Sequence, residues 1–294
     1  MVTLEFLATL QQQPLLLTAV VFVFGLLIGS FLNVVIFRLP VMLEAGWKTE
    51  ARAILEIEEP EAPSTRFNLI VPNSRCPSCG HQIRWFENIP VASWLILRGK
   101  CSQCGTSISS RYPIIELACG LMSATVAMVV GYGAELLPAL AFTWVLIALA
   151  MIDYDTMLLP DQLTLPLLWG GLLAALTGHS AVDLRDAVTG AMFGYLALWS
   201  VFWLFKLVTG KEGMGYGDFK LLAALGAWMG WQMIPLIVLL SSLVGAIVGI
   251  TLIATHLIKR EQGIPFGPYL AAAGWIALLW GNTLISQYLQ LFQY

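Results

Sequence analysis

Charged residues are scarce in this chain of 294 residues, since Asp, Glu, Lys and Arg together make up 11% of it. In soluble proteins, these four residue types make up about 25% of the sequence. Hydrophobic residues reach 58%, and the mean hydropathy is +0.79. So little charge excludes an ordinary soluble domain and predicts an α-helical protein that crosses a membrane several times.

Signatures of several other protein classes are also missing. The three histidines, at 81, 179 and 256, lie far apart, and no Ser or Cys nucleophile motif accompanies them, so nothing indicates a catalytic triad. No glycine-rich nucleotide fingerprint is visible, and no internal repeat of the kind common in transporters stands out. No cleavable signal peptide is evident, so we expect the first apolar run to remain as a span.

Eight apolar runs predict eight membrane-spanning helices, at about 20 residues per span. Their approximate limits are 15–37, 114–132, 136–152, 163–178, 186–208, 219–231, 233–257 and 266–285. The predicted fold class is therefore an all-α polytopic membrane protein. The fourth and sixth runs have the least certain limits, because the fourth has Pro166 near its start and the sixth is short.

The basic residues predict the orientation of these spans, because Lys and Arg concentrate on the cytoplasmic side. An outside N-terminus places four segments in the cytoplasm, 38–113, 153–162, 209–218 and 258–265. These segments and the adjoining span ends hold every Lys and Arg except Arg185. We therefore expect both chain termini to lie outside.

All cysteines but one lie in the long segment between the first and second spans. They form two Cys-x-x-Cys pairs, each followed by Gly, at Cys76, Cys79, Cys101 and Cys104. This spacing matches two zinc knuckles, in which the glycine lets the backbone turn its amides toward the sulfurs. Redox chemistry is the alternative, but a cytoplasmic location disfavours structural disulfides. We predict one Zn²⁺ on four thiolates, and interpret Cys119 as a small buried apolar residue.

The same segment is rich in glutamate. Only two basic residues, Lys48 and Arg52, interrupt the acidic series Glu44, Glu50, Glu56, Glu58, Glu59 and Glu61. A solvated helix or an acidic linker is the favoured interpretation. A docking surface for a basic peptide is the alternative.

Two aspartates stand at the ends of apolar runs, Asp153 after the third and Asp218 before the sixth. An ionisable group in or beside a membrane costs about 2.5–3.5 kcal/mol even on the lenient insertion scale, so it usually has a function. Two carboxylates brought together can share one proton, so that one acts as base and the other as acid. This pair predicts aspartyl protease chemistry at a membrane surface.

These aspartates also have structural alternatives. Asp218 could cap the sixth span, but a cap does not require the glycines before it. Those glycines, which leave room for a ligand or an extended peptide, are Gly213, Gly215 and Gly217. We interpret Asp161 as a helix cap and Asp155 as a neighbour on the loop side rather than a catalyst.

Taken in order along the chain, these motifs resemble the type IV prepilin peptidases, whose relatives include other intramembrane aspartyl proteases with a Gly-x-Gly-Asp signature. The motifs are Gly-Ser-Phe-Leu-Asn-Val-Val-Ile at 29–36, the two cysteine pairs, Trp-Phe-Glu-Asn-Ile-Pro at 85–90, the segment 152–166 containing Leu-Pro-Asp, and Gly-Tyr-Gly-Asp at 215–218. The resemblance covers nearly the whole chain.

The resemblance implies a bifunctional enzyme of type IV pilus and type II secretion systems. It implies that Asp153 and Asp218 cleave the leader of prepilins and pseudopilins, and that S-adenosylmethionine then donates a methyl group to the new N-terminus. It also implies Zn²⁺ on the four cysteines. It does not identify the residues that bind the methyl donor.

We expect this enzyme in the bacterial inner membrane, in contact with lipid, with its active site facing the cytoplasm and no nucleic-acid partner. The expected domains are an N-terminal transmembrane helix at 1–37, a zinc-binding insert associated with methyl transfer at 38–113, and a helical peptidase domain at 114–294. The alternatives are an ion-coupled transporter that uses the Asp pair and a zinc-bearing membrane scaffold without catalysis.

Overall fold

The computed structural model describes residues 8–57, 67–257 and 263–291. These residues are almost wholly helical and contain no strand, only two isolated β-bridges. The longer helices are α2 (Pro14–Ile54), α4 (Arg111–Val130), α5 (Leu136–Thr156), α6 (Asp161–Leu176), α7 (Leu184–Thr209), α8 (Tyr216–Met229), α9 (Ile234–Ala254) and α10 (Gly267–Gln290). Each predicted span has a counterpart in this series, and the predicted fold class is confirmed.

Within the described residues, six of the helical segments are long and apolar enough to cross a membrane. The two shorter helices are α6, with 16 residues, and α8, with 14. At about 1.5 Å per residue, each falls short of a hydrocarbon core of about 30 Å. They are the two spans whose limits the sequence defined least well.

The first long helix extends well beyond the predicted span, because α2 continues past Pro40 to Ile54. Its polar continuation carries Glu44, whose carboxylate lies 2.6 Å from the Lys48 amine one turn later. The described part of the acidic segment is therefore largely a solvated helix, as favoured from the sequence. The remaining acidic residues of that prediction, Glu58, Glu59 and Glu61, lie outside the described residues.

The chain divides into two compact units, Met1–Met128 and Val129–Tyr294. In the first unit, α2 and α4 approach closely at two glycines. A Cβ atom on Gly25 would lie 2.7 Å from the Ser123 hydroxyl oxygen, and one on Gly29 would lie 2.7 Å from the Glu116 Cα. Small residues at such crossings let helix backbones pack directly against each other. The sequence-based domain limits at 37 and 113 stay a prediction.

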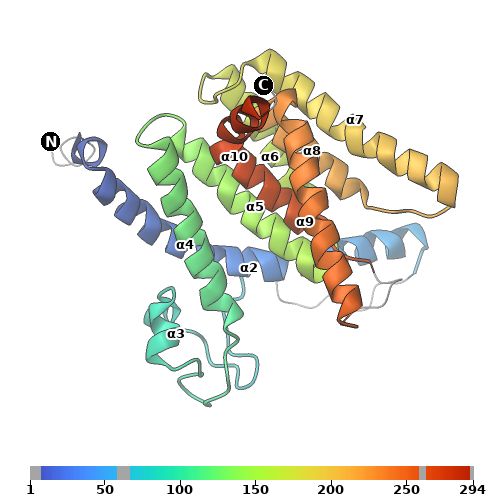
Figure 1. The fold of residues 1–294 in the computed structure, drawn as a ribbon. Helices are drawn as coiled ribbons and strands as arrows, with labels where there is room; N and C mark the ends of the chain where they lie inside the picture. Colours follow the sequence, from blue (N-terminus) through green and yellow to red (C-terminus); the bar gives the residue numbers. More distant parts are fainter. Residues whose placement is uncertain (1–7, 58–66, 258–262, 292–294) are drawn as a thin grey trace. The chain divides into compact units, whose positions relative to one another are not determined.

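The second unit is a bundle formed by α5 to α10 (Figure 1), with α8 at its core. Residues from Asp218 to Met229 of α8 are buried except Lys220, and the helix packs against α6, α7 and α10. Glycines 190 and 226 bring the α7 and α8 backbones into contact. A short helix surrounded by protein is thus held in place at the centre of the bundle, and its first turn carries Asp218.

Candidate active site and metal centre

Asp153 lies in the last turn of α5 and is 5% exposed. Its Oδ2 atom accepts a hydrogen bond of 2.8 Å from the backbone amide of Gly267, the first residue of α10. The first amides of a helix lack partners within the helix and form its positive end. The start of α10 therefore provides a fixed donor for this buried carboxylate.

Asp218 lies in the first turn of α8 and is 7% exposed. The N-cap of this helix is Gly215 rather than Asp218. The Asp218 amide donates a hydrogen bond of 3.3 Å to the Gly215 carbonyl, and no side chain caps the helix. The cap alternative for Asp218 is therefore not borne out, because Asp218 lies inside the first turn of the helix.

One leucine connects the two aspartate-bearing regions. A Cβ atom on Gly217 would lie 2.7 Å from the Leu159 Cβ, and one on Gly267 would lie 3.1 Å from the Leu159 Cδ2. The starts of α8 and α10 therefore pack against the same side chain, and the Asp153 and Asp218 carboxyl groups interact electrostatically. The structure brings together the two carboxylates that the sequence singled out.

Asp161 is not the cap of α6, because that position belongs to Pro160 and no side chain caps the helix. The prediction of a cap was wrong. The Asp161 carboxylate instead accepts hydrogen bonds of 2.7 and 2.8 Å from the Lys220 amine of α8. Asp155 is exposed in the last turn of α5, and its role as a neighbour rather than a catalyst stays a prediction.

Gly267 was not identified from the sequence, and Leu159 was named there only as part of the Leu-Pro-Asp motif. Pro268 marks the start of a helix, since proline is common in the first helical turn, but nothing in the local sequence connects Gly267 to Asp153. The contact joins residues 114 positions apart, so it depends on the tertiary arrangement of α5 and α10.

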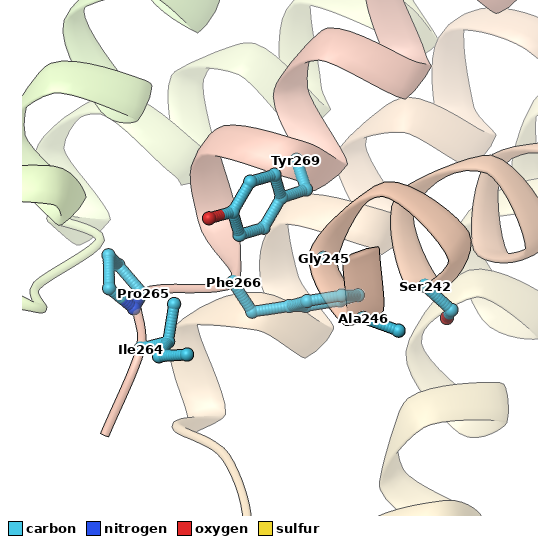
Figure 2. Close-up of a pocket in the computed structure, with 7 residues that line it drawn as sticks. All are labelled: Ser242, Gly245, Ala246, Ile264, Pro265, Phe266 and Tyr269. Carbon is cyan, nitrogen blue, oxygen red and sulfur yellow. The ribbon is translucent and has the colours of Figure 1, made fainter. Parts of the chain in front are cut away.

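An open cavity of about 260 Å³ lies between α9 and the start of α10 (Figure 2). Its walls are mainly apolar and are formed by Ser242, Gly245, Ala246, Ile264, Pro265, Phe266 and Tyr269. Phe266 immediately precedes Gly267, so the cavity lies one residue along the chain from the amide that binds Asp153. The sequence did not predict this feature.

The four predicted cysteine ligands lie together in the first unit, with their sulfur atoms within 4.8 Å of one another. Two sulfur pairs are 3.8 and 4.0 Å apart. A tetrahedral thiolate site with metal–sulfur bonds of about 2.3 Å requires sulfur separations of about 3.8 Å, whereas a disulfide requires about 2.05 Å. The donor set fits a tetrahedral metal ion and does not form disulfides.

The two cysteine pairs adopt matching backbone turns. The amides of Cys76 and Cys101 donate to the carbonyls of residues five positions later, at 2.8 and 2.9 Å. Gly80 and Gly105 have φ angles of +73° and +71°, which glycine adopts without steric cost. The glycine after each pair thus has the role that the knuckle motif predicts. Cys119, in contrast, is fully buried in α4, as expected.

Glu87 connects the two turns. Its carboxylate accepts hydrogen bonds from the Ser102 hydroxyl at 2.6 Å and from the Arg84 amide at 2.8 Å, and lies 3.1 Å from the His81 ring. Ser102 and the Arg84 amide, together with His81, lower the pKa of Glu87 to about 2. The carboxylate therefore stays ionised through the physiological pH range. It contacts His81, which follows the first cysteine pair, and Ser102, which lies within the second.

The thiols of the cluster differ in acidity. The Thr106 hydroxyl and amide lower the pKa of Cys104 to about 6. The His81 amide acts to lower the pKa of Cys79, but desolvation and the neighbouring sulfurs outweigh it and raise that pKa to about 11. A metal ion must bind all four as thiolates, so Cys104 is ready to bind at neutral pH and Cys79 must lose its proton on binding.

Comparisons with known proteins cover both units. Residues 23–130 match the bacterial peptidase A24 N-terminal domain, and residues 140–250 match the type IV leader peptidase family. No solved structure matches the chain.

Three curated relatives carry the name prepilin leader peptidase/N-methyltransferase. The protein from Stutzerimonas stutzeri is 57% identical over 290 residues, which is 99% of each chain. The one from Aeromonas salmonicida is 60% identical over 94% of this chain and 95% of its own. The one from Pseudomonas aeruginosa is 57% identical over 96% of each. At this identity and coverage, the chain belongs to the type IV leader peptidase family.

Proposed function

We propose that this protein is a bifunctional prepilin leader peptidase and N-methyltransferase, with Asp153 and Asp218 as its proteolytic residues. The observation that carries the peptidase assignment is the meeting of two buried carboxylates at helix ends, in a chain of the leader peptidase family. The family assignment supports a protease and methyltransferase and does not support an ion-coupled transporter.

Peptide hydrolysis needs a base to activate water and an acid to protonate the leaving amine. Two adjacent carboxylates that share one proton provide both. The ionised carboxylate takes a proton from a water molecule that attacks the scissile carbonyl. The protonated carboxylate donates a hydrogen bond to the developing oxyanion and then transfers its proton to the leaving nitrogen, while the proton taken from water stays on the other carboxylate. The Gly267 amide holds Asp153 in one orientation throughout, so that this carboxylate does not need to be reoriented during the reaction.

The proposed substrates are prepilins and pseudopilins. A basic leader stays on the cytoplasmic side of a membrane, and the apolar stem after it enters the bilayer. An active site at the cytoplasmic ends of α5 and α8 would meet the peptide where these two parts join. We accordingly propose an inner-membrane protein with both termini outside and the carboxylate pair facing the cytoplasm.

We propose Zn²⁺ as the metal on Cys76, Cys79, Cys101 and Cys104, because four thiolates with tetrahedral spacing favour it. Bound there, zinc supplies a structural cross-link between the two cysteine turns. The second activity acts on the α-amine that cleavage sets free, and S-adenosylmethionine is the proposed methyl donor.

Mass spectrometry of a co-expressed prepilin tests the proposal. The pilin should lose its leader and gain the mass of one methylene group on its new N-terminal residue, but only when this protein is present. A prepilin that stays intact beside a folded, membrane-inserted enzyme would favour the scaffold alternative. Cleavage without the mass gain would remove the methyltransferase half of the assignment.

A further inference from the structure

We propose that the ion pair between Asp161 and Lys220 positions the Asp218 carboxylate for catalysis and acts on turnover more than on stability. This inference rests on the proposed peptidase function of Asp218. It gives a role to Asp161, which stands outside the predicted carboxylate pair.

Lys220 is two residues after Asp218 in the first turns of α8. Side chains two positions apart on a helix point about 200° away from each other. Asp218 is therefore directed into the bundle, where it is buried, while the Lys220 amine reaches out to the start of α6. Both Asp161 oxygens accept from that amine, at 2.7 and 2.8 Å. The pair thus holds the same helical turn that carries Asp218.

The opposite end of α8 is held by packing. The Trp228 indole donates a hydrogen bond of 2.8 Å to the Leu167 carbonyl, and a Cβ atom on Gly171 would lie 2.7 Å from the Trp228 ring. The beginning of α8 follows residues 210–215, which are irregular and contain three glycines. It packs against Leu159 at Gly217 and against the Phe202 ring at Tyr216, and the ion pair adds a charged link to α6 at the turn that carries the carboxylate.

The solvent exposure of this ion pair indicates that its loss should affect catalysis more than stability. The side chains of Lys220 and Asp161 are 32% and 48% exposed, and ion pairs this accessible to water contribute little to global stability. Catalytic rates are more sensitive, since a displacement of about 1 Å can cost about 100-fold. Loss of the pair should lower kcat by about 10-fold or more and change KM by less than about 2-fold.

The test is a charge exchange measured with purified enzyme in detergent and a prepilin substrate. Lys220→Asp and Asp161→Lys should each lower kcat with little change in KM or melting temperature. The double variant, which restores an ion pair in the reverse sense, should recover kcat to within about 3-fold of the parent. Lys220→Arg, which keeps the charge, should remain close to the parent. Lys48→Met removes an exposed lysine from a different ion pair, the one with Glu44, and serves as the matched control.

Two results would overturn the inference. One is a kcat within 2-fold of the parent in both single variants. The other is a folded double variant whose kcat is no better than the product of the two single effects. Asp218→Asn, included in the same assay, should abolish cleavage. If this variant still cleaves at the parental rate, the proposed carboxylate pair is refuted, and the inference that rests on it is refuted as well. If Asp218→Asn is inactive while the ion-pair variants are unaffected, only the positioning role fails.

Discussion

Substituting Gly267 by alanine should slow leader cleavage far more than it lowers the stability of the protein. A Cβ atom at this position would lie 2.6 Å from the Asp153 Oδ2 and 3.0 Å from its Cγ, whereas ordinary contacts begin at 3.4 Å. Either Asp153 or the start of α10 must therefore move by about 0.8 Å, the difference between 3.4 and 2.6 Å. That movement also stretches the 2.8 Å hydrogen bond from the Gly267 amide.

The expected loss follows from the size of this displacement. A misplacement of about 1 Å can cost about 100-fold in rate, so kcat should fall by about 10- to 100-fold. Gly267 has no positive φ angle, and alanine forms helices better than glycine. The backbone should therefore accept alanine, and a change in helix stability alone would favour the variant.

The assay is single-turnover cleavage of a purified prepilin, with a thermal melt of each enzyme. Gly263→Ala is the matched control, because among the described residues a Cβ atom there would meet only the Met157 side chain, at 3.7 Å. The control should cleave at the parental rate. A Gly267→Ala enzyme that cleaves as fast as the control would refute the conclusion that this close contact fixes Asp153.

Three further predictions concern the metal centre and the second activity. Purified protein should contain about one Zn²⁺ per chain, and a Cys76→Ser, Cys101→Ser double variant should lose it; full zinc occupancy in that variant would exclude the site. In metal-stripped protein, iodoacetamide at pH 7 should modify Cys104 well before Cys79, because thiolate is the reactive form and the two exposed thiols have pKa values of about 6 and about 11. The Cys104 rate should rise as pH passes through about 6, and equal modification of the two would contradict the assigned environments. An Asp218→Asn enzyme should still methylate a pilin peptide that already begins at its mature residue, and loss of that transfer in folded enzyme would mean that the two activities share one site.

The helices could be predicted from the sequence because apolar runs mark membrane spans directly. The run predicted at 136–152, for example, corresponds to Leu136–Thr156. The end of α2 could not be predicted in this way. Hydropathy reports where a helix leaves the apolar region and not where its hydrogen bonding stops, so the polar continuation to Ile54 was missed.

The candidate carboxylates and thiolates could be predicted for a similar reason. A charge beside an apolar run is costly, and paired cysteines followed by glycine match a local backbone motif, so both leave a signal in a few consecutive residues. The supporting contacts leave no such signal. The Asp161–Lys220 pair spans 59 positions and the Asp153–Gly267 hydrogen bond spans 114, so both became visible only once the helices were placed.

The most direct test of the account is prepilin cleavage by enzymes with Asp153→Asn or Asp218→Asn, compared with Asp155→Asn. An amide is nearly the same size as a carboxylate but cannot exchange the proton that hydrolysis requires. Mass spectrometry of the co-expressed prepilin should show no leader loss with either of the first two enzymes, both still in the membrane, and substantial cleavage with the third. Cleavage near the parental rate by Asp153→Asn or Asp218→Asn would contradict the assignment of this pair as the catalytic site.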